Sequence, residues 1–199
     1  MEGDNKMKTL IIYTHPGHDS LNGAFLKAVK KGMDNSISKH EVEVLDLYEE
    51  KFNPVLVFNT QMRRRDMNTD PAFEKYREQI RWADRLVFIY PIFWGRPPAM
   101  LLGYFDQIFA SNFAYKDMPG KIYPEGLLTN KSVVCISTMK GPGGYILLTL
   151  GNAHKVLMKK AVFNFTGIKR VKFFEFGSME SPKGNQGKKL AVVQAYFSK

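Results

Sequence analysis

The chain alternates short apolar runs with longer amphipathic stretches. The runs at 8–14, 85–90 and 132–137 are almost continuously apolar, which is typical of strands that are covered on both faces. Residues 41–47 instead alternate between polar and apolar, which predicts a more exposed strand near a sheet edge. With a further apolar segment at 170–176, the pattern predicts five strands.

Amphipathic segments between and after these runs predict helices. They cover residues 21–29, 71–82, 100–109, 151–165 and 187–197. Ser20 is a suitable N-cap for the first, and Pro71 suits the first turn of the second. The pattern is weak over 48–70, where we expect an extended excursion with about one turn of helix. Residues 111–130, which contain several prolines and glycines, form a long connection of the kind often kept for function or assembly.

Strand and helix alternate along the whole chain, without an internal repeat or an obvious linker. This order predicts an α/β fold of one domain, with a doubly wound five-stranded parallel sheet between two layers of helices. In such sheets, ligands bind beyond the carboxyl ends of the strands. We therefore expect the loops 15–22, 91–98 and 138–145 to meet at one edge.

Composition sets the compartment and limits the partners. The chain has 199 residues and one cysteine, so it cannot form an internal disulfide, and a reducing compartment is the natural expectation. No apolar stretch is long enough to span a membrane and the amino terminus does not resemble a signal sequence, which indicates a cytoplasmic protein.

Most of the net charge of +10 lies after Lys155. This basic segment could attract anions, but without a nucleic-acid motif a solvated surface explains it equally simply.

The first loop, 15–22, has neither a Gly-x-Gly-x-x-Gly nor a Walker pattern, so it does not predict a nucleotide site of those kinds. It does place Ser20 and Asn22 at the start of a helix, where free backbone N–H groups and the helix dipole favour a phosphate. His15 and His18 could add positive charge. A capped helix without a ligand is the alternative explanation.

The other two loops add apolar surface and backbone access. Pro91-Ile92-Phe93-Trp94-Gly95 places large apolar side chains at a strand end, where a flat aromatic ligand would bury them. Packing against the next helix or a partner subunit would explain them as well. Residues 138–145 combine three glycines with Tyr145. A single ligand shared by the three loops accounts for all of these features.

Other chemistries are not expected. Cys135 lies inside a predicted strand, where a buried structural thiol is the usual outcome. The four histidines, at 15, 18, 40 and 154, show no close metal-ligand spacing, and no nucleophile elbow is present. We therefore expect no metal and neither hydrolase nor metalloenzyme activity.

Several short motifs follow one another along the chain. They are His15-Pro16 with Ser20-x-Asn22, Asp46-Leu47-Tyr48 followed by Phe52-Asn53-Pro54-Val55, Pro91-Ile92-Phe93-Trp94 leading to Pro98-Ala99 and Phe105-Asp106, and Phe113-Ala114-Tyr115. In this order they resemble the flavodoxin-like NAD(P)H:quinone oxidoreductases, including the ancillary reductases of bacterial glutathione-gated potassium-efflux systems. The resemblance covers nearly all of the chain after Met7, which makes residues 1–6 an extension and 7–199 the flavin-binding domain.

The resemblance implies a tightly bound flavin. FMN is favoured over FAD, because the longer C-terminal region of the animal enzymes is missing. NAD(P)H would donate a hydride, and two electrons would pass to a quinone or another small aromatic acceptor by a ping-pong mechanism. The cofactor-binding residues would be His15, Ser20, Leu21 and Asn22 at the ribityl phosphate, Pro91, Ile92, Phe93 and Trp94 along the ring, and Thr138, Met139, Lys140, Gly141 and Tyr145 at its pyrimidine edge. The catalytic residues would be Tyr145, Lys140 and Tyr115.

The sequence also departs from this family. Met139 and Lys140 stand where the family often has two glycines, and His154 comes too late to match the histidine that follows the tyrosine in larger quinone reductases. The Lys140 ammonium would either favour the reduced ring or point into solvent.

Two expectations about partners follow from the resemblance. Similar enzymes are homodimers in which the segment that matches Tyr115 reaches the neighbour's active site, so we expect a homodimer here. The alternative to an enzyme is a flavodoxin-like regulatory subunit that binds a potassium-efflux channel or another protein partner through its basic C-terminal surface. Such a subunit could associate peripherally with a membrane transporter.

Overall fold

Five parallel strands form the central sheet in the order β2-β1-β3-β6-β7. The computed structural model describes residues 6–181 and 184–199. The strands are β1 (Met7–Tyr13), β2 (His40–Asp46), β3 (Arg85–Pro91), β6 (Ser132–Thr138) and β7 (Arg170–Phe176), each parallel to its neighbours. The predicted five-stranded parallel sheet is confirmed. Residues 1–5 of the expected extension, and Lys183 of the basic segment, lie outside the described residues.

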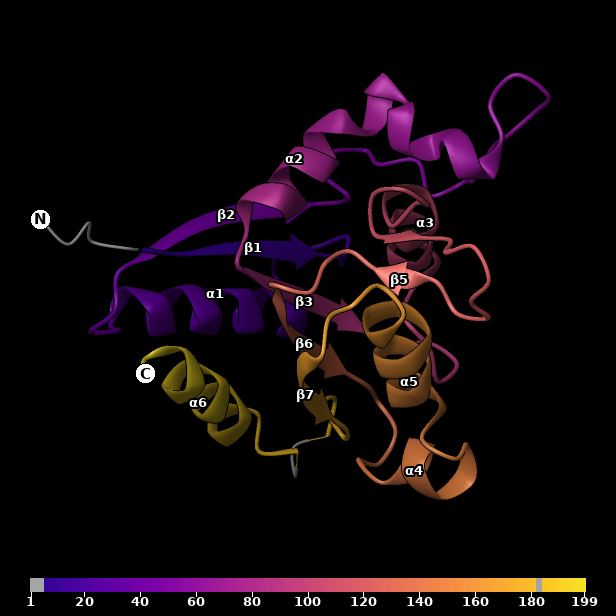
Figure 1. Ribbon diagram of the computed structural model, residues 1–199. Coiled ribbons are helices and arrows are strands. Elements are labelled where there is room, and N and C mark those ends of the chain that lie inside the picture. Colours follow the sequence, from indigo (N-terminus) through magenta and orange to yellow (C-terminus); the bar gives the residue numbers. More distant parts are fainter. Residues whose placement is uncertain (1–5, 182–183) are drawn as a thin grey trace, which may run out of the picture.

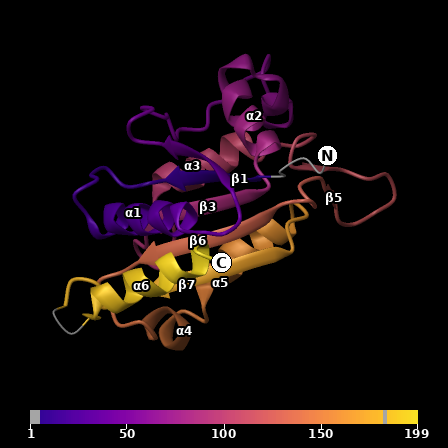
Figure 2. The same ribbon diagram turned by 90° about the vertical axis from the view of Figure 1, so that its left-hand side faces the viewer.

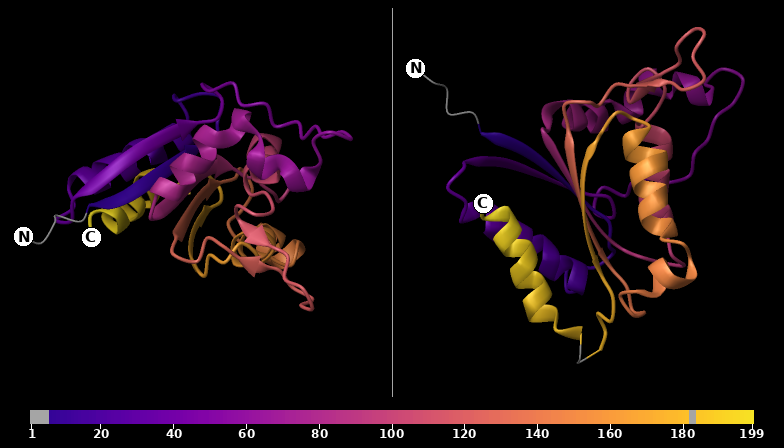
Figure 3. Two further views of the ribbon diagram at one scale, coloured as in Figure 1. Left: turned by 45° about the horizontal axis from the view of Figure 1, so that its top comes forward. Right: turned by 60° about the horizontal axis from the view of Figure 1, so that its bottom comes forward.

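Helices cover both faces of this sheet, as Figure 1 shows. On one face, α1 (Leu21–Asp34) and α6 (Gln186–Phe197) lie side by side (Figure 2, Figure 3). The opposite face carries α2 (Glu74–Trp82), α3 (Ala99–Ile108) and α5 (Ala153–Val156). This arrangement confirms the expected three layers, with a hydrophobic core on each side of the sheet.

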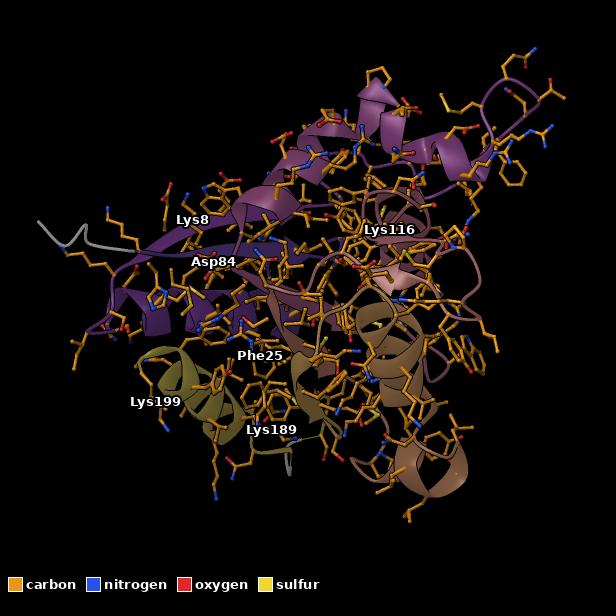
Figure 4. The ribbon with its side chains drawn as sticks, in the orientation of Figure 1. Lys8, Phe25, Asp84, Lys116, Lys189 and Lys199 are labelled. Atoms are coloured by element: carbon orange, nitrogen blue, oxygen red, sulfur yellow. The ribbon has the colours of Figure 1, made fainter. Side chains whose placement is uncertain are left out.

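Aromatic contacts join the layers. The ring of Phe25, labelled on α1 in Figure 4, stacks on Phe176 of β7 at 5.1 Å between centroids. On the other face, Phe88 of β3 lies 5.3 Å from Phe105 of α3. Phe25 and Phe88 are fully buried, and burying a side chain of this size contributes about 1.5–3 kcal/mol. The two faces of β3 and β6 are therefore both covered, as their apolar runs predict.

The exposure of β2, an edge strand of the sheet, follows the alternation in its sequence. Exposed residues alternate along most of β2, and Val44 is 40% exposed. This confirms the edge position predicted for 41–47. Within the described residues, no helix is both long and apolar enough to cross a lipid bilayer.

Several local predictions were wrong in detail. The helix expected over 151–165 is a short α5 that continues as a π-helix, Leu157–Asn164. A separate helix, α4 (Tyr145–Thr149), follows the glycine-rich loop. Five residues are too few to show a helical period, which is why the sequence did not reveal it.

The two irregular segments contain more structure than their patterns predict. The excursion at 48–70 ends in a 3₁₀ helix, Arg64–Thr69. The connection at 111–130 contains a two-stranded antiparallel ribbon of β4 (Tyr115–Lys116) and β5 (Glu125–Gly126). Strands of two residues have no detectable alternation, so only their pairing identifies them.

Candidate functional site

The loops that follow β1, β3 and β6 enclose two adjoining cavities, which together we call the groove. The smaller cavity, of about 380 Å³, is lined by His15, Leu21, Asn22, Pro91, Ile92, Phe93, Thr138, Met139, Lys140, Met179 and Glu180. The larger, of about 650 Å³, is lined by Ile92, Phe93, Trp94, Gly95, Met139, Lys140, Gly141, Tyr145, Ile146 and Leu150. The expected convergence of three loops at the carboxyl edge of the sheet is therefore confirmed.

The amino end of α1 forms the polar end of the groove. Ser20 is the N-cap, and its hydroxyl accepts a hydrogen bond from the backbone N–H of Gly23 at 3.1 Å. Within residues 6–181 and 184–199, the backbone N–H groups of Leu21 and Asn22 donate to no acceptor. Free N–H groups in the first turn of a helix are the usual ligands of a phosphate. His15, which contacts the carbonyl of Gly17 through Nδ1 at 2.8 Å, lines the same cavity.

Asn22 also connects the first loop to the third. Its Nδ2 donates to Oγ1 of Thr138 at 3.1 Å, and both side chains are buried. Such a hydrogen bond between buried groups holds the ends of β6 and α1 in one relative position.

The second loop is a tight turn that raises an aromatic side chain into solvent. Phe93 and Arg96 exchange two backbone hydrogen bonds of 3.0 Å. Trp94 and Gly95 between them have φ of 52° and 73°, as in a two-residue hairpin turn with both central residues left-handed. The Trp94 side chain is 94% exposed. A Cβ on Gly95 would lie 2.7 Å from Leu150, so the turn closely approaches the end of α4.

The third loop is braced by the segment after β7. The backbone N–H of Ser178 donates to Gly141 at 2.7 Å, and a Cβ on Gly177 would lie 2.2 Å from the nitrogen of Gly143. Lys140 pairs with Glu180 at 3.2 Å, with side chains that are 81% and 62% exposed. The ammonium therefore stands at the rim of the groove beside a carboxylate.

Tyr145 begins α4 at the far side of the larger cavity. Its backbone N–H donates to the carbonyl of Pro142 at 3.0 Å, and its side chain is half exposed. The phenol can therefore meet a ligand that enters the larger cavity.

His154 is not a partner of Tyr145. It is fully buried, with Nε2 2.8 Å from the hydroxyl of Tyr90 and Nδ1 2.6 Å from Oε2 of Glu175. Both ring nitrogens are thus engaged inside the molecule, away from the groove.

The two partners of the His154 ring belong to a row of polar residues that lie in register on three neighbouring strands. Tyr90 of β3 is in register with Ser137 of β6, and Ser137 is in register with Glu175 of β7. Burial raises the pKa of Tyr90 well above its usual range. Burial would also raise the pKa of Glu175, but hydrogen bonds and charge from His154 and Lys155 bring it below the usual value. The row anchors α5 two residues before the apolar floor of the groove, formed by Ile92 and Met139.

Two of the predicted site residues do not line the groove. The Ser20 hydroxyl is occupied by the helix cap and by the carbonyl of Gly17. Tyr115 packs edge-on against Phe165, with ring centroids 4.8 Å apart. It lines two other cavities, of about 400 and 240 Å³, together with Arg64. Within one chain, Tyr115 is therefore separate from the groove.

Cys135 is fully buried in β6. Burial raises the pKa of its thiol, so the residue is a poor nucleophile. This agrees with the structural role expected from its place in a strand.

Gly95, which the sequence places in the second loop, closes the aromatic turn and lines the larger cavity. Some groove residues escaped sequence reasoning: Ile146, Leu150, Met179 and Glu180. Met179 and Glu180 follow the last strand, and neither residue type in that place indicates a ligand. Their role depends on the fold bringing the end of β7 beside the end of β6.

Comparison with known proteins agrees with this architecture. Residues 7–197 match the family model described as a flavodoxin-like fold. A Haemophilus influenzae protein named an uncharacterized NAD(P)H oxidoreductase is 29% identical over 176 residues, which cover 87% of this chain and 85% of that protein.

Two solved structures share the fold. An NAD(P)H:quinone oxidoreductase from Methanothermobacter marburgensis superimposes with a TM-score of 0.84 at 22% identity, covering 98% of this chain and 96% of the other. An FMN-dependent NADH-azoreductase from Bacillus anthracis, solved in complex with FMN, gives a TM-score of 0.77 at 18% identity, with 96% and 98% covered.

Proposed function

The chain belongs to the flavodoxin-like fold family, which its residues 7–197 match, and on this premise we propose that it is an FMN-dependent NAD(P)H:quinone oxidoreductase. The observation that carries the proposal is the groove, which combines a phosphate-binding helix start with an apolar middle at one sheet edge. The names of the Haemophilus protein and of the archaeal quinone oxidoreductase support the reaction class. The azoreductase solved with FMN supports the cofactor.

The donor set of the groove fits FMN. The free N–H groups of Leu21 and Asn22, with the His15 ring, would hold the terminal phosphate. Pro91, Ile92 and Phe93 would line the isoalloxazine ring, and the backbone from Thr138 to Gly141 would face its pyrimidine edge. The space beside Gly141 is open, since an added Cβ there would meet nothing within 4 Å. A ligand in the groove can therefore come close to the backbone of this residue. One phosphate-binding helix start in the groove favours FMN over FAD.

When bound, the flavin supplies the hydride acceptor and the two-electron donor of the reaction. The residues of this chain provide the surroundings. Ile92 and Met139 keep water from the floor, because both are less than a tenth exposed. Tyr145 offers a phenolic hydrogen-bond donor in the larger cavity, and Lys140 offers a cation near the edge where negative charge develops on reduction.

One open cavity would serve both substrates. The larger cavity lies between the Trp94 turn and α4, and the part of it that a bound flavin leaves free would take one flat ring at a time. The nicotinamide and the quinone would therefore occupy it in turn, which predicts ping-pong kinetics.

We also propose a homodimer. Exposed apolar side chains surround the groove, with Trp94 94%, Leu148 83% and Leu147 60% exposed. A surface of this kind in a monomer is usually an interface. Tyr115, which lies outside its own chain's groove, would reach the groove of the second copy.

Steady-state kinetics test the proposed reaction. With FMN-loaded protein, NADPH and a soluble naphthoquinone, double-reciprocal plots should give parallel lines at several quinone concentrations. Intersecting lines would contradict the ping-pong order. A protein that retains FMN but oxidises neither NADPH nor NADH would support the regulatory-subunit alternative instead.

A further inference from the structure

A second cluster of polar side chains lies outside the groove, on the loop after β1, the end of β2 and the turn that follows β2. It consists of His18, Asp46 and Glu49, whose potential ligand atoms all lie within 4.8 Å of one another. Nε2 of His18 is 2.8 Å from Oδ2 of Asp46 and 3.2 Å from Oε1 of Glu49. None of the three lines the groove.

Neighbouring groups hold two of these side chains in place. The His18 ring stacks on Tyr13, with centroids 5.1 Å apart and planes at 22°. Oδ1 of Asp46 accepts hydrogen bonds from the backbone N–H groups of Tyr48 and Glu49 at 2.9 and 3.1 Å. The Asp46 carboxylate is therefore fixed with Oδ2 turned toward His18.

Oδ2 of Asp46 lacks a hydrogen-bond donor within the described residues. The side chain is 7% exposed, and within the described ranges this oxygen is buried and accepts no hydrogen bond. Its neighbour within the cluster is Nε2 of His18, at 2.8 Å, as an ion pair if the ring is charged and not as a hydrogen bond. A buried carboxylate oxygen without a donor is costly. A cation between the three side chains would satisfy it.

From this geometry we propose that His18, Asp46 and Glu49 bind one divalent transition-metal ion per chain, with Zn²⁺ as the fitting ion. Imidazole nitrogen and carboxylate oxygen are both zinc ligands, whereas Mg²⁺ and Ca²⁺ prefer oxygen ligands alone. Tetrahedral bonds of ~2.0–2.1 Å separate neighbouring donor atoms by about 3.3 Å. The present separations of 2.8 and 3.2 Å need only small outward shifts.

The site would be open on one side. The side chains of His18 and Glu49 are 45% and 73% exposed, so water can complete the coordination of the ion. Bound there, the ion would fasten the loop that carries His15 and Ser20 to the turn after β2. The site does not depend on the proposed oxidoreductase activity, so the two can fail separately.

Isothermal titration of tag-free, chelator-treated protein with ZnCl₂ tests the proposal. We expect one equivalent of Zn²⁺ per chain, and affinity at least about tenfold weaker in His18→Ala and in Glu49→Gln. Glu50→Gln and His40→Ala are the matched controls, since they remove a neighbouring carboxylate and another imidazole outside the cluster. Both should bind Zn²⁺ as the wild type does.

Two results would overturn the metal site. One is the absence of saturable Zn²⁺ binding by the wild type, which would leave the cluster as a contact among three side chains and no metal site. The other is unchanged affinity in both His18→Ala and Glu49→Gln. A measurement on the wild type does not depend on the variants folding: long-range ¹H–¹⁵N spectra should show the His18 imidazole shifting on Zn²⁺ addition. Shifts at other histidines with His18 unmoved would equally refute the assignment.

Discussion

Asn22 donates a hydrogen bond to Oγ1 of Thr138 at 3.1 Å, although the two residues are 116 positions apart in the chain. Both side chains are buried, so the bond is shielded from competition by water. It joins the helix start that would hold a phosphate to the loop that would face the opposite end of a flavin. The groove is therefore positioned by contacts within the protein itself, and a ligand need not order it.

Removing this bond should weaken both the fold and flavin binding. Thr138→Val keeps the side-chain shape but leaves the Asn22 amide buried without its partner, at a cost of about 1–3 kcal/mol. We expect that loss in the free energy of unfolding from urea titration, with roughly tenfold weaker FMN binding by fluorescence quenching. Thr60→Val, at an exposed position, is the control. Wild-type stability and affinity in Thr138→Val would show that the bond contributes nothing.

The buried Glu175 should make stability depend on pH. A carboxyl group whose pKa is lower in the folded than in the unfolded state stabilises the fold above its unfolded pKa, and this stabilisation is lost as the pH falls through the folded pKa. Since the pKa of Glu175 is lowered, Glu175→Gln should be less stable than the wild type at pH 7, and the difference should shrink below about pH 4.

Urea unfolding at pH 7 and at acidic pH measures this difference. Glu180→Gln is the matched control, because its carboxylate is 62% exposed and its pairing with Lys140 is an interaction worth about 0–1 kcal/mol. A Glu175→Gln deficit that is the same at both pH values would mean that packing, and not charge, accounts for it.

The rim pair should tune the flavin in opposite directions. Removing the ammonium in Lys140→Met should lower the midpoint potential, and removing the carboxylate in Glu180→Gln should raise it, because negative charge develops on reduction. Both groups are mostly exposed, so shifts of only about 10–20 mV are expected, equivalent to roughly 0.5–1 kcal/mol for a two-electron couple. Spectroscopic redox titration measures them. Shifts of the same sign, or an unchanged potential in Lys140→Met, would leave this lysine without an electrostatic role.

The Tyr145 hydroxyl should matter for turnover and not for cofactor retention. Tyr145→Phe removes one hydrogen-bond donor from the larger cavity, and a loss of about tenfold in kcat/KM corresponds to ~1.4 kcal/mol, near the value of one hydrogen bond. FMN should still be retained, because the phosphate end of the groove is intact. Tyr123→Phe, at an exposed tyrosine outside the groove, should behave as the wild type. Full activity in Tyr145→Phe would remove this residue from the reaction.

The sequence predicted the sheet and the three convergent loops because their signals are local. The apolar runs of β3 and β6 show burial on both faces, and the Ser20 cap marks the start of α1. The partnership of His154 with Tyr90 and Glu175 could not be read in this way, because it depends on strand register and on how α5 packs. The same holds for the pairing of Lys140 with Glu180, which are 40 positions apart in the sequence.

The cluster of His18, Asp46 and Glu49 could not be recognised from the sequence for a related reason. The four histidines show no metal-ligand spacing along the chain. His18 comes from the loop after β1, whereas Asp46 and Glu49 come from the end of β2 and the turn that follows it. Adjacent parallel strands bring their carboxyl ends together, so sheet order and not sequence spacing assembles these three residues.

The most direct test of the central claim is the absorbance spectrum of the anaerobic, FMN-reconstituted protein during stepwise addition of NADPH and then of a naphthoquinone. The account predicts one FMN per chain, bleaching of the flavin band near 450 nm with about one equivalent of NADPH, and full recovery of that band with about one equivalent of quinone. Failure to retain FMN, or a bound flavin that neither NADPH nor NADH bleaches, would contradict it.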